Sequence, residues 1–244
     1  MTPLPEQVLR AVLLPVLVAQ ALQVRRKALR LPEASGPRDG VAGDGPVLRL
    51  LIAGDSSAAG VGVAVQDQAL AGRLVAELAG AFEVHWRLEA RTGADSAETI
   101  RRLAGLDGTF DVVVTALGVN DVTGLVRGRV WMERQRLLSA LARERFAARL
   151  IVTSGLPPMG RFPLLPQPLR WMLGRQARRF DAGLADLAAA APDIAHVRFD
   201  LPLSPADMAE DGYHPGAAIY AEWARLVAGV IRARLGERRV APPL

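Results

Sequence analysis

Short apolar runs alternate with longer stretches of helical spacing through most of this chain. The runs are rich in Val, Ile and Leu and lie at 47–53, 82–88, 111–117, 149–154 and 195–200. The intervening and final stretches repeat apolar residues every three or four positions, at 66–80, 95–106, 130–147, 169–191 and 216–235. Strands joined by helices long enough to cross over predict a parallel sheet with helices on both faces. We therefore expect a three-layer α/β/α sandwich.

An apolar tract at 8–24 precedes this alternating region and is followed by three basic residues. The tract is short for a membrane-spanning helix and contains Pro15. Three interpretations stay open: a helix packed on the domain, which we favour, a helix lying in a membrane interface, and a secretory signal cleaved near Ala19-Gln20-Ala21. The Gly- and Pro-rich residues that follow are typical of a linker. The expected organisation is an N-terminal apolar helix at 1–31, a linker at 32–46 and one folded domain at 47–244.

Composition narrows the class of protein further. A chain of 244 residues, half of them apolar, can bury the core of one large domain. No cysteine is present, so disulfide bonds and thiolate chemistry are excluded. The 30 basic residues give a net charge of +5 but are scattered along the expected helices, which indicates solvated helix faces and no nucleic-acid partner. We expect a cytoplasmic or membrane-associated protein, with export less favoured; the oligomeric state is left open.

Small and polar residues follow directly after the first expected strand. The sequence there is Gly54-Asp55-Ser56-Ser57, with further glycines at 60 and 62. A phosphate-binding loop would need a lysine after its last glycine, and a dinucleotide fingerprint would need another glycine spacing. What is left is a serine at the carboxyl end of a strand, where α/β sheets bind ligands. Taken alone, the same serine is also typical of a helix N-cap.

Three more polar motifs fall at the same expected edge of the sheet. Gly93, in a turn after the second strand, could present a bare backbone N–H, although a plain turn glycine is the commoner case. Asn120 follows the third strand and could donate hydrogen bonds through its amide, or brace the loop together with Asp121. Asp211 precedes His214 by three residues ahead of the last helix, a spacing that lets a carboxylate orient an imidazole. No set of residues has the spacing of a metal site.

Taken together, the four motifs resemble those of the SGNH hydrolases, also called the GDSL lipase/esterase family. The likeness covers about 47–235 and rests on GDSS at 54–57, Gly93, GVND at 118–121 and DGYH at 211–214. One departure is Ser57, which stands where the family's GDSL motif has leucine. The resemblance implies a flavodoxin-like sheet of five parallel strands in the order 2-1-3-4-5, and neither a metal nor an organic cofactor.

The resemblance also implies roles for individual residues. Ser56 would be the nucleophile, His214 its general base and then acid, and Asp211 the group that orients His214. The oxyanion would be stabilised by the N–H groups of Ser56 and Gly93 and by the side-chain amide of Asn120. Asp55 would brace the turn. The expected activity is that of a serine esterase working through a Ser-His-Asp triad and an acyl-enzyme intermediate.

The substrate is less sharply indicated. Residues 155–173 combine prolines with large apolar residues and could wall an acyl pocket, form a partial lid, or be an ordered loop on the core. We expect a small acyl ester, with a short chain, bound by Val119, Leu156, Pro157 and Met159. Lysophospholipids, thioesters and acetylated carbohydrates stay as alternatives, and a non-catalytic binding protein as a more remote one. A peripheral membrane contact through 8–24 also stays open.

Overall fold

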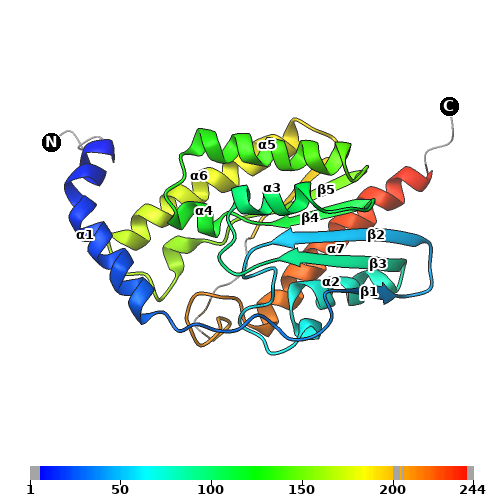
Figure 1. Cartoon of the computed structure of the whole chain (residues 1–244), viewed down its shortest axis with the longest axis horizontal. Coiled ribbons are helices and arrows are strands. Elements are labelled where there is room, and N and C mark those ends of the chain that lie inside the picture. Colours follow the sequence, from blue (N-terminus) through cyan, green and yellow to red (C-terminus); the bar gives the residue numbers. More distant parts are fainter. Residues whose placement is uncertain (1–5, 200–203, 205, 241–244) are drawn as a thin grey trace.

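The computed structural model describes residues 6–199, 204 and 206–240, and it is built around a single sheet (Figure 1). The strands stand in the order β1-β3-β2-β4-β5-β6. All neighbours pair in parallel except β1 and β3, which are antiparallel. The strands are β1 (Asp39–Ala42), β2 (Val47–Gly54), β3 (Glu83–Ala90), β4 (Val112–Ala116), β5 (Leu150–Ser154) and β6 (Ile194–Val197).

Helices cover both faces of the sheet, as expected for a three-layer α/β/α sandwich. Helices α2 (Leu70–Ala79) and α7 (Ala217–Val240) pack against each other on one face. Helices α3 (Ser96–Ala104), α5 (Gly128–Glu144) and α6 (Leu169–Ala189) lie on the other (Figure 1). Short helices follow β2, β4 and β5: η1 (Gln66–Gln68), α4 (Val119–Thr123) and η2 (Met159–Arg161).

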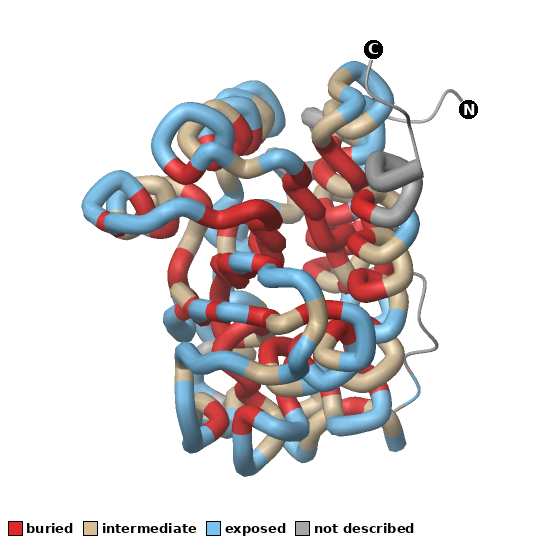
Figure 2. Tube along the Cα trace, turned by 90° about the vertical axis from the view of Figure 1, so that its right-hand side faces the viewer, coloured by how far each residue is buried: buried red, intermediate tan, exposed pale blue. Residues whose placement is uncertain are grey.

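Burial on both faces explains why the strands are apolar at nearly every position. In β2, Leu50 and Ile52 belong to the core under α2 and α7, whereas Leu51 and Ala53 belong to the core under α3 and α5. Figure 2 shows the result as buried residues in the interior of the molecule, with exposed residues around the outside. Successive side chains of a strand point to opposite faces, so a strand covered on both sides must be apolar throughout.

The predicted parallel sheet is confirmed, and its strand count is corrected. The five parallel strands stand in the expected order 2-1-3-4-5 when they are numbered along the chain. The sixth strand, β1, lies within 32–46, which the sequence suggested to be a linker, and it pairs with the edge of β3. Its four residues, DGVA, are too few and too small to carry a strand pattern, because an edge strand needs mainly backbone partners.

Helix α1 (Glu6–Lys27) contains the apolar tract and contacts the domain beside α6. Leu17 is buried there and Leu13 packs against the core, while Val12 and Val16 are exposed. The side chain of Gln20 donates a hydrogen bond to the carbonyl of Gln167 (2.5 Å) and accepts one from the N–H of Leu169 (3.1 Å). Within the described ranges, no helix combines the length and hydropathy needed to cross a membrane.

Candidate active site

The loop after β2 holds Ser56 at the carboxyl end of the sheet. A Cβ on Gly54 would lie 2.3 Å from the Cβ of Ala58 and 2.6 Å from the carbonyl oxygen of Ala116, so only glycine fits this approach to β4. The N–H of Asp55 donates to the same Ala116 carbonyl (3.2 Å). Beyond it, the Asp55 carboxylate accepts a hydrogen bond from the N–H of Ser57 (3.0 Å). The turn therefore fixes the backbone on both sides of Ser56.

His214 lies beside Ser56 although the two are distant in the sequence. Its Nε2 is 2.9 Å from Oγ of Ser56, and its Nδ1 is 2.5 Å from Oδ2 of Asp211. The other oxygen of Asp211 accepts hydrogen bonds from the N–H groups of Tyr213 and His214, both at 2.9 Å. These bonds close the DGYH turn around the carboxylate, so the structure brings Ser56, His214 and Asp211 into one hydrogen-bonded chain.

The charge of Asp211 determines which nitrogen of His214 carries a proton. Burial acts to raise the pKa of Asp211, but the hydrogen bonds from the His214 ring and from the two backbone N–H groups outweigh burial and lower it. An ionised carboxylate only accepts hydrogen bonds, so the Nδ1 of His214 must carry a proton and donate it to Asp211. In the neutral imidazole Nε2 is then an acceptor, and the hydroxyl of Ser56 donates to it. This is the arrangement in which a base can take the serine proton.

Hydrogen bonds between α7 and the loop that carries Ser56 hold His214 and Ser56 in position. The hydroxyl of Tyr220, in the first turn of α7, donates a buried hydrogen bond to the carbonyl of Val61 (2.7 Å). Val61 in turn donates its N–H to the carbonyl of Ser56 (3.0 Å). The position of His214, just before α7, is thereby linked to the backbone of Ser56.

The donors expected to stabilise an oxyanion are the N–H groups of Ser56 and Gly93 and the side-chain amide of Asn120. Gly93 has φ of 82°, a left-handed conformation that favours glycine, and a Cβ there would point into open space. Among the described residues, no acceptor meets the N–H of Gly93 or that of Ser56. The side-chain amide of Asn120 donates one hydrogen bond to the carbonyl of Ala94 (2.9 Å), and among the described residues its second N–H has no acceptor. Gly93, Asn120 and His214 line the same groove.

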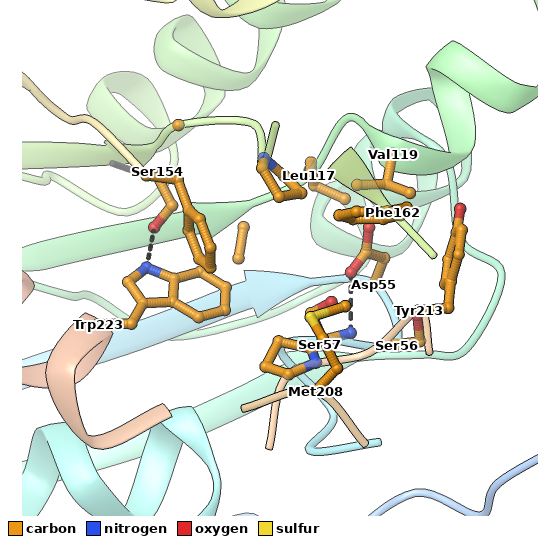
Figure 3. Close-up of a pocket in the computed structure, with 15 residues that line it drawn as sticks. Asp55, Ser56, Ser57, Leu117, Val119, Ser154, Phe162, Met208, Tyr213 and Trp223 are labelled. Atoms are coloured by element: carbon orange, nitrogen blue, oxygen red, sulfur yellow. Dashed lines mark hydrogen bonds between the residues drawn. The ribbon is translucent and has the colours of Figure 1, made fainter. Parts of the chain in front are cut away.

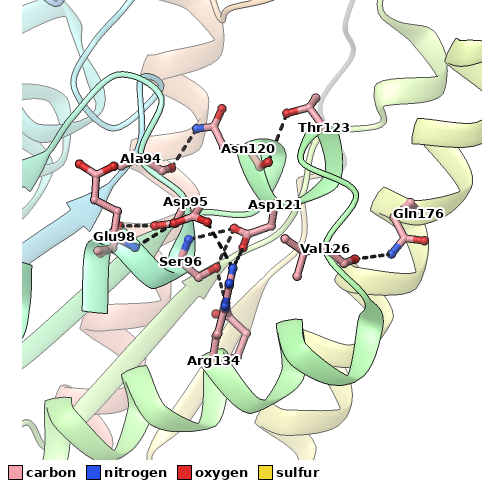
Figure 4. A network of polar contacts seen from close by, with 12 residues as sticks. Ala94, Asp95, Ser96, Glu98, Asn120, Asp121, Thr123, Val126, Arg134 and Gln176 are labelled. Carbon is pink, nitrogen blue, oxygen red and sulfur yellow. Dashed lines mark hydrogen bonds and ion pairs between the residues drawn. The ribbon is translucent and has the colours of Figure 1, made fainter. Parts of the chain in front are cut away.

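A buried polar network connects the start of α3, just after Gly93, with the short helix α4 that carries Asn120 (Figure 4). Asp121 is fully buried and accepts hydrogen bonds from the N–H (3.0 Å) and the hydroxyl (2.6 Å) of Ser96. Arg134 on α5 donates to Asp121 (2.9 Å) and lies 3.3 Å from Asp95, which caps α3. Sequence reasoning did not find Ser96 and Arg134, because neither belongs to a local motif and only the fold brings them to Asp121.

The expected substrate-binding residues separate into two groups. Val119 and Pro157 line a small pocket of about 40 Å³ that Ser56 also lines (Figure 3). Leu156 and Met159 are instead buried in the core that contacts α6. The cavity is far below the volume of a small-molecule site, so it does not by itself accommodate a substrate.

One family model and several solved structures resemble this chain. A model of the GDSL-like lipase/acylhydrolase family matches residues 52–222. Among curated proteins, none matches. Among similar solved structures, TesA has a TM-score of 0.62 and 22% identity over 76% of this chain and 99% of its own. A carbohydrate acetylesterase family member from Sinorhizobium meliloti has a TM-score of 0.59 and 19% identity (78% of this chain, 99% of its own), and the psychrotrophic esterase EstA from Pseudoalteromonas sp. has 0.56 and 18% (77% and 98%). At these identities the likeness shows the fold.

Asp55 is a buried carboxyl group that titrates in an accessible range. Burial raises its pKa to about 6, although the hydrogen bond from the N–H of Ser57 acts in the opposite direction. A folded-state pKa above the unfolded value means that the folded protein binds more protons between these two values. The contribution of Asp55 to stability is therefore fully present below about pH 4 and is lost as the pH rises to about 6.

We predict that Asp55→Asn removes this loss of stability with rising pH. From pH 4 to pH 6.5, the free energy of unfolding of the parent should fall relative to that of the variant by about 2 kcal/mol, because each pKa unit corresponds to about 1.4 kcal/mol and part of the change lies outside this pH range. Urea unfolding of both proteins at several pH values measures this difference. Asp107→Asn, at an exposed side chain, is the matched control and should run parallel to the parent. Parallel curves for Asp55→Asn as well would contradict the pKa.

Proposed function

Since this chain belongs to the GDSL-like lipase/acylhydrolase family and is a carboxylic ester hydrolase, we propose that it cleaves esters through a Ser56–His214–Asp211 triad. The observation that supports this most strongly is the continuous hydrogen-bonded chain from Asp211 through His214 to Ser56, at 2.5 and 2.9 Å. Ser56 has an adjacent base, and that base has an orienting carboxylate, which is the combination that activates a serine hydroxyl.

The first half of the reaction transfers the acyl group to the enzyme. Oγ of Ser56 attacks the ester carbonyl carbon while its proton passes to Nε2 of His214. The negative oxygen of the tetrahedral intermediate accepts hydrogen bonds from the N–H groups of Ser56 and Gly93 and from the amide of Asn120. Asp211 stabilises the imidazolium of His214. The carbon–oxygen bond to the alcohol then breaks, the alcohol takes the proton from Nε2, and the acyl group remains on Ser56.

The second half releases the acid. A water molecule gives a proton to Nε2 of His214 and attacks the acyl carbonyl, so that the oxyanion forms again at the same donors. The bond to Oγ breaks, Oγ recovers the proton from His214, and a carboxylic acid leaves. Two passages through one oxyanion site explain why preorganised donors matter: they stabilise charge that develops only in the transition states.

Short acyl esters that dissolve in water are the simplest substrates for testing this chemistry. They require only that the carbonyl reach Ser56 and the three donors. Thioesters and acetylated carbohydrates would pass through the same steps with a different leaving group, so the triad does not choose among them.

We predict that Ser56→Ala lowers kcat/KM for a short-chain ester at least 10,000-fold, because it removes the attacking oxygen and nothing else. Ser57→Ala is the matched control, because the contact of Ser57 with Asp55 uses its backbone N–H, which alanine retains. It should stay within tenfold of the parent. Steady-state hydrolysis of 4-nitrophenyl acetate measures both. If Ser57→Ala were inactive and Ser56→Ala active, Ser56 would not be the nucleophile.

We further predict that Asn120→Ala lowers kcat about 100- to 1,000-fold and leaves KM nearly unchanged, as expected for the loss of one oxyanion donor. Thr123→Val is the control, because it removes a hydrogen bond to the Asn120 carbonyl (3.3 Å) but leaves the Asn120 amide in place. Its kcat should stay within threefold of the parent. If Asn120 only braces the loop through Ala94, its replacement will lower the melting temperature while kcat stays within threefold, and the proposed role is then wrong.

A further inference from the structure

Helix α1 turns an apolar stripe toward the candidate active site. Seen along the chain, these residues recur at intervals of three and four, which places them on one face of the helix. They line a groove between α1 and the start of α6, and they include Leu14, Leu17, Val18, Ala21, Leu22 and Val24. The expected linker after α1 does not carry the helix away from the domain; α1 stands beside α6 at the end of the molecule (Figure 1).

The groove is continuous with the site at Ser56. Its far wall includes Leu169 and Met172 of α6, and its inner end is formed by Gly93, Asn120 and His214. The volume is about 1000 Å³, at the upper end of the range for small-molecule sites. An ester whose carbonyl sits at the oxyanion donors would therefore extend one of its two arms into this groove.

The polarity of the groove changes along its length. Polar and charged side chains, including Asp95 and Glu98, lie near the oxyanion donors, whereas α1 and α6 contribute almost only aliphatic side chains. A ligand that matches this distribution has a polar carbonyl end and a long apolar tail.

The packing of α1 leaves most of its stripe uncovered. Leu17 is only 5% exposed, and the two hydrogen bonds of Gln20 hold the helix to the segment before α6. Leu14, Val18 and Leu22 remain 53%, 50% and 50% exposed although they face the groove. Apolar surface of this kind gains stability when a ligand removes it from water.

We propose that this groove binds the aliphatic chain of a long-chain ester and that α1 sets the chain-length preference. The proposal rests on the proposed function, because the chain is tethered to the carbonyl that Ser56 attacks. It departs from the short chains expected from the sequence, since α1 adds a wall to a crevice that would otherwise be shallow. The aliphatic chain could belong to the acyl part or to the alcohol part of the ester.

The test compares two alanines of α1. Ala21 lines the groove and Ala19 does not, while both are exposed. In the parent, kcat/KM should rise about threefold per added methylene over part of the range from two to sixteen carbons, measured below the critical micelle concentration. Ala21→Trp should lower the ratio of long-chain to short-chain kcat/KM at least tenfold. Ala19→Trp should keep that ratio within twofold of the parent.

Two substrate series identify the arm that enters the groove. One series lengthens the acyl chain of 4-nitrophenyl esters, and the other lengthens the alcohol of acetate esters. A chain-length gain that Ala21→Trp removes in either series supports the proposal and names the arm. If Ala21→Trp kept the chain-length gain of the parent in both series, or if the parent showed no gain in either, the proposal would be overturned.

A binding experiment separates this proposal from the catalytic one. In the Ser56→Ala background, the fluorescent fatty acid parinaric acid should bind, and Ala21→Trp should weaken its binding at least tenfold while Ala19→Trp does not. This result does not depend on turnover. If the Ser56→Ala protein bound the fatty acid but the parent hydrolysed no ester, the proposed function alone would be refuted. Ester hydrolysis with no binding and no chain-length gain would refute the groove alone.

Two other occupants of the stripe would give different results. If a second copy of the protein covered the stripe, light scattering would show the parent to be a dimer, and Ala21→Trp would change its oligomeric state. If a lipid surface covered it, the gain with chain length would appear only on phosphatidylcholine vesicles and not with substrate dissolved below its critical micelle concentration. Either result would overturn the assignment of the groove to the substrate chain.

Discussion

The hydrogen bond between Nε2 of His214 and Oγ of Ser56 joins residues 158 positions apart, and every proposed step of the chemistry depends on it. A parallel sheet makes such a contact possible, because all its carboxyl ends meet at one edge. The sheet alone brings the loops that carry Ser56 and His214 to the same edge but does not fix the two side chains within those loops. The close approach at Gly54 and the Tyr220–Val61 hydrogen bond supply the remaining precision, since they tie the serine loop to β4 and to α7. A geometry held by buried backbone contacts needs little rearrangement when the substrate arrives.

The candidate site was largely predictable because its residues lie in short local motifs. Gly54 ends β2, Asn120 follows β4 by four residues, and the Asp211–His214 pair precedes α7, and each of these positions is visible in the hydrophobic pattern. The same pattern could not reveal β1, whose pairing is a backbone contact with β3. It could not reveal Arg134 either, which looks like any solvated arginine of an amphipathic helix until the fold brings it to Asp121. Local patterns record burial and turns, whereas long-range polar partners depend on the assembled structure.

The N-terminal helix shows most clearly what tertiary contacts add. Its apolar tract is compatible with packing, with a membrane interface and with a signal, because all three need an apolar helix. The structure adds two facts, the anchoring of Gln20 beside α6 and a stripe that faces the groove ending at His214. Chain-length preference would then come from an element outside the residues matched by the family model, while the chemistry comes from within them.

Labelling with a fluorophosphonate tests the central claim most directly, because the phosphorus reacts with an activated serine: its bond to Oγ forms as fluoride leaves. Intact-mass spectrometry and peptide mapping locate the adduct, with heat-denatured protein as the control. The account predicts one adduct per chain, on Ser56, in the folded protein and none in the denatured one. No adduct on the folded protein, or an adduct on another residue, would contradict it.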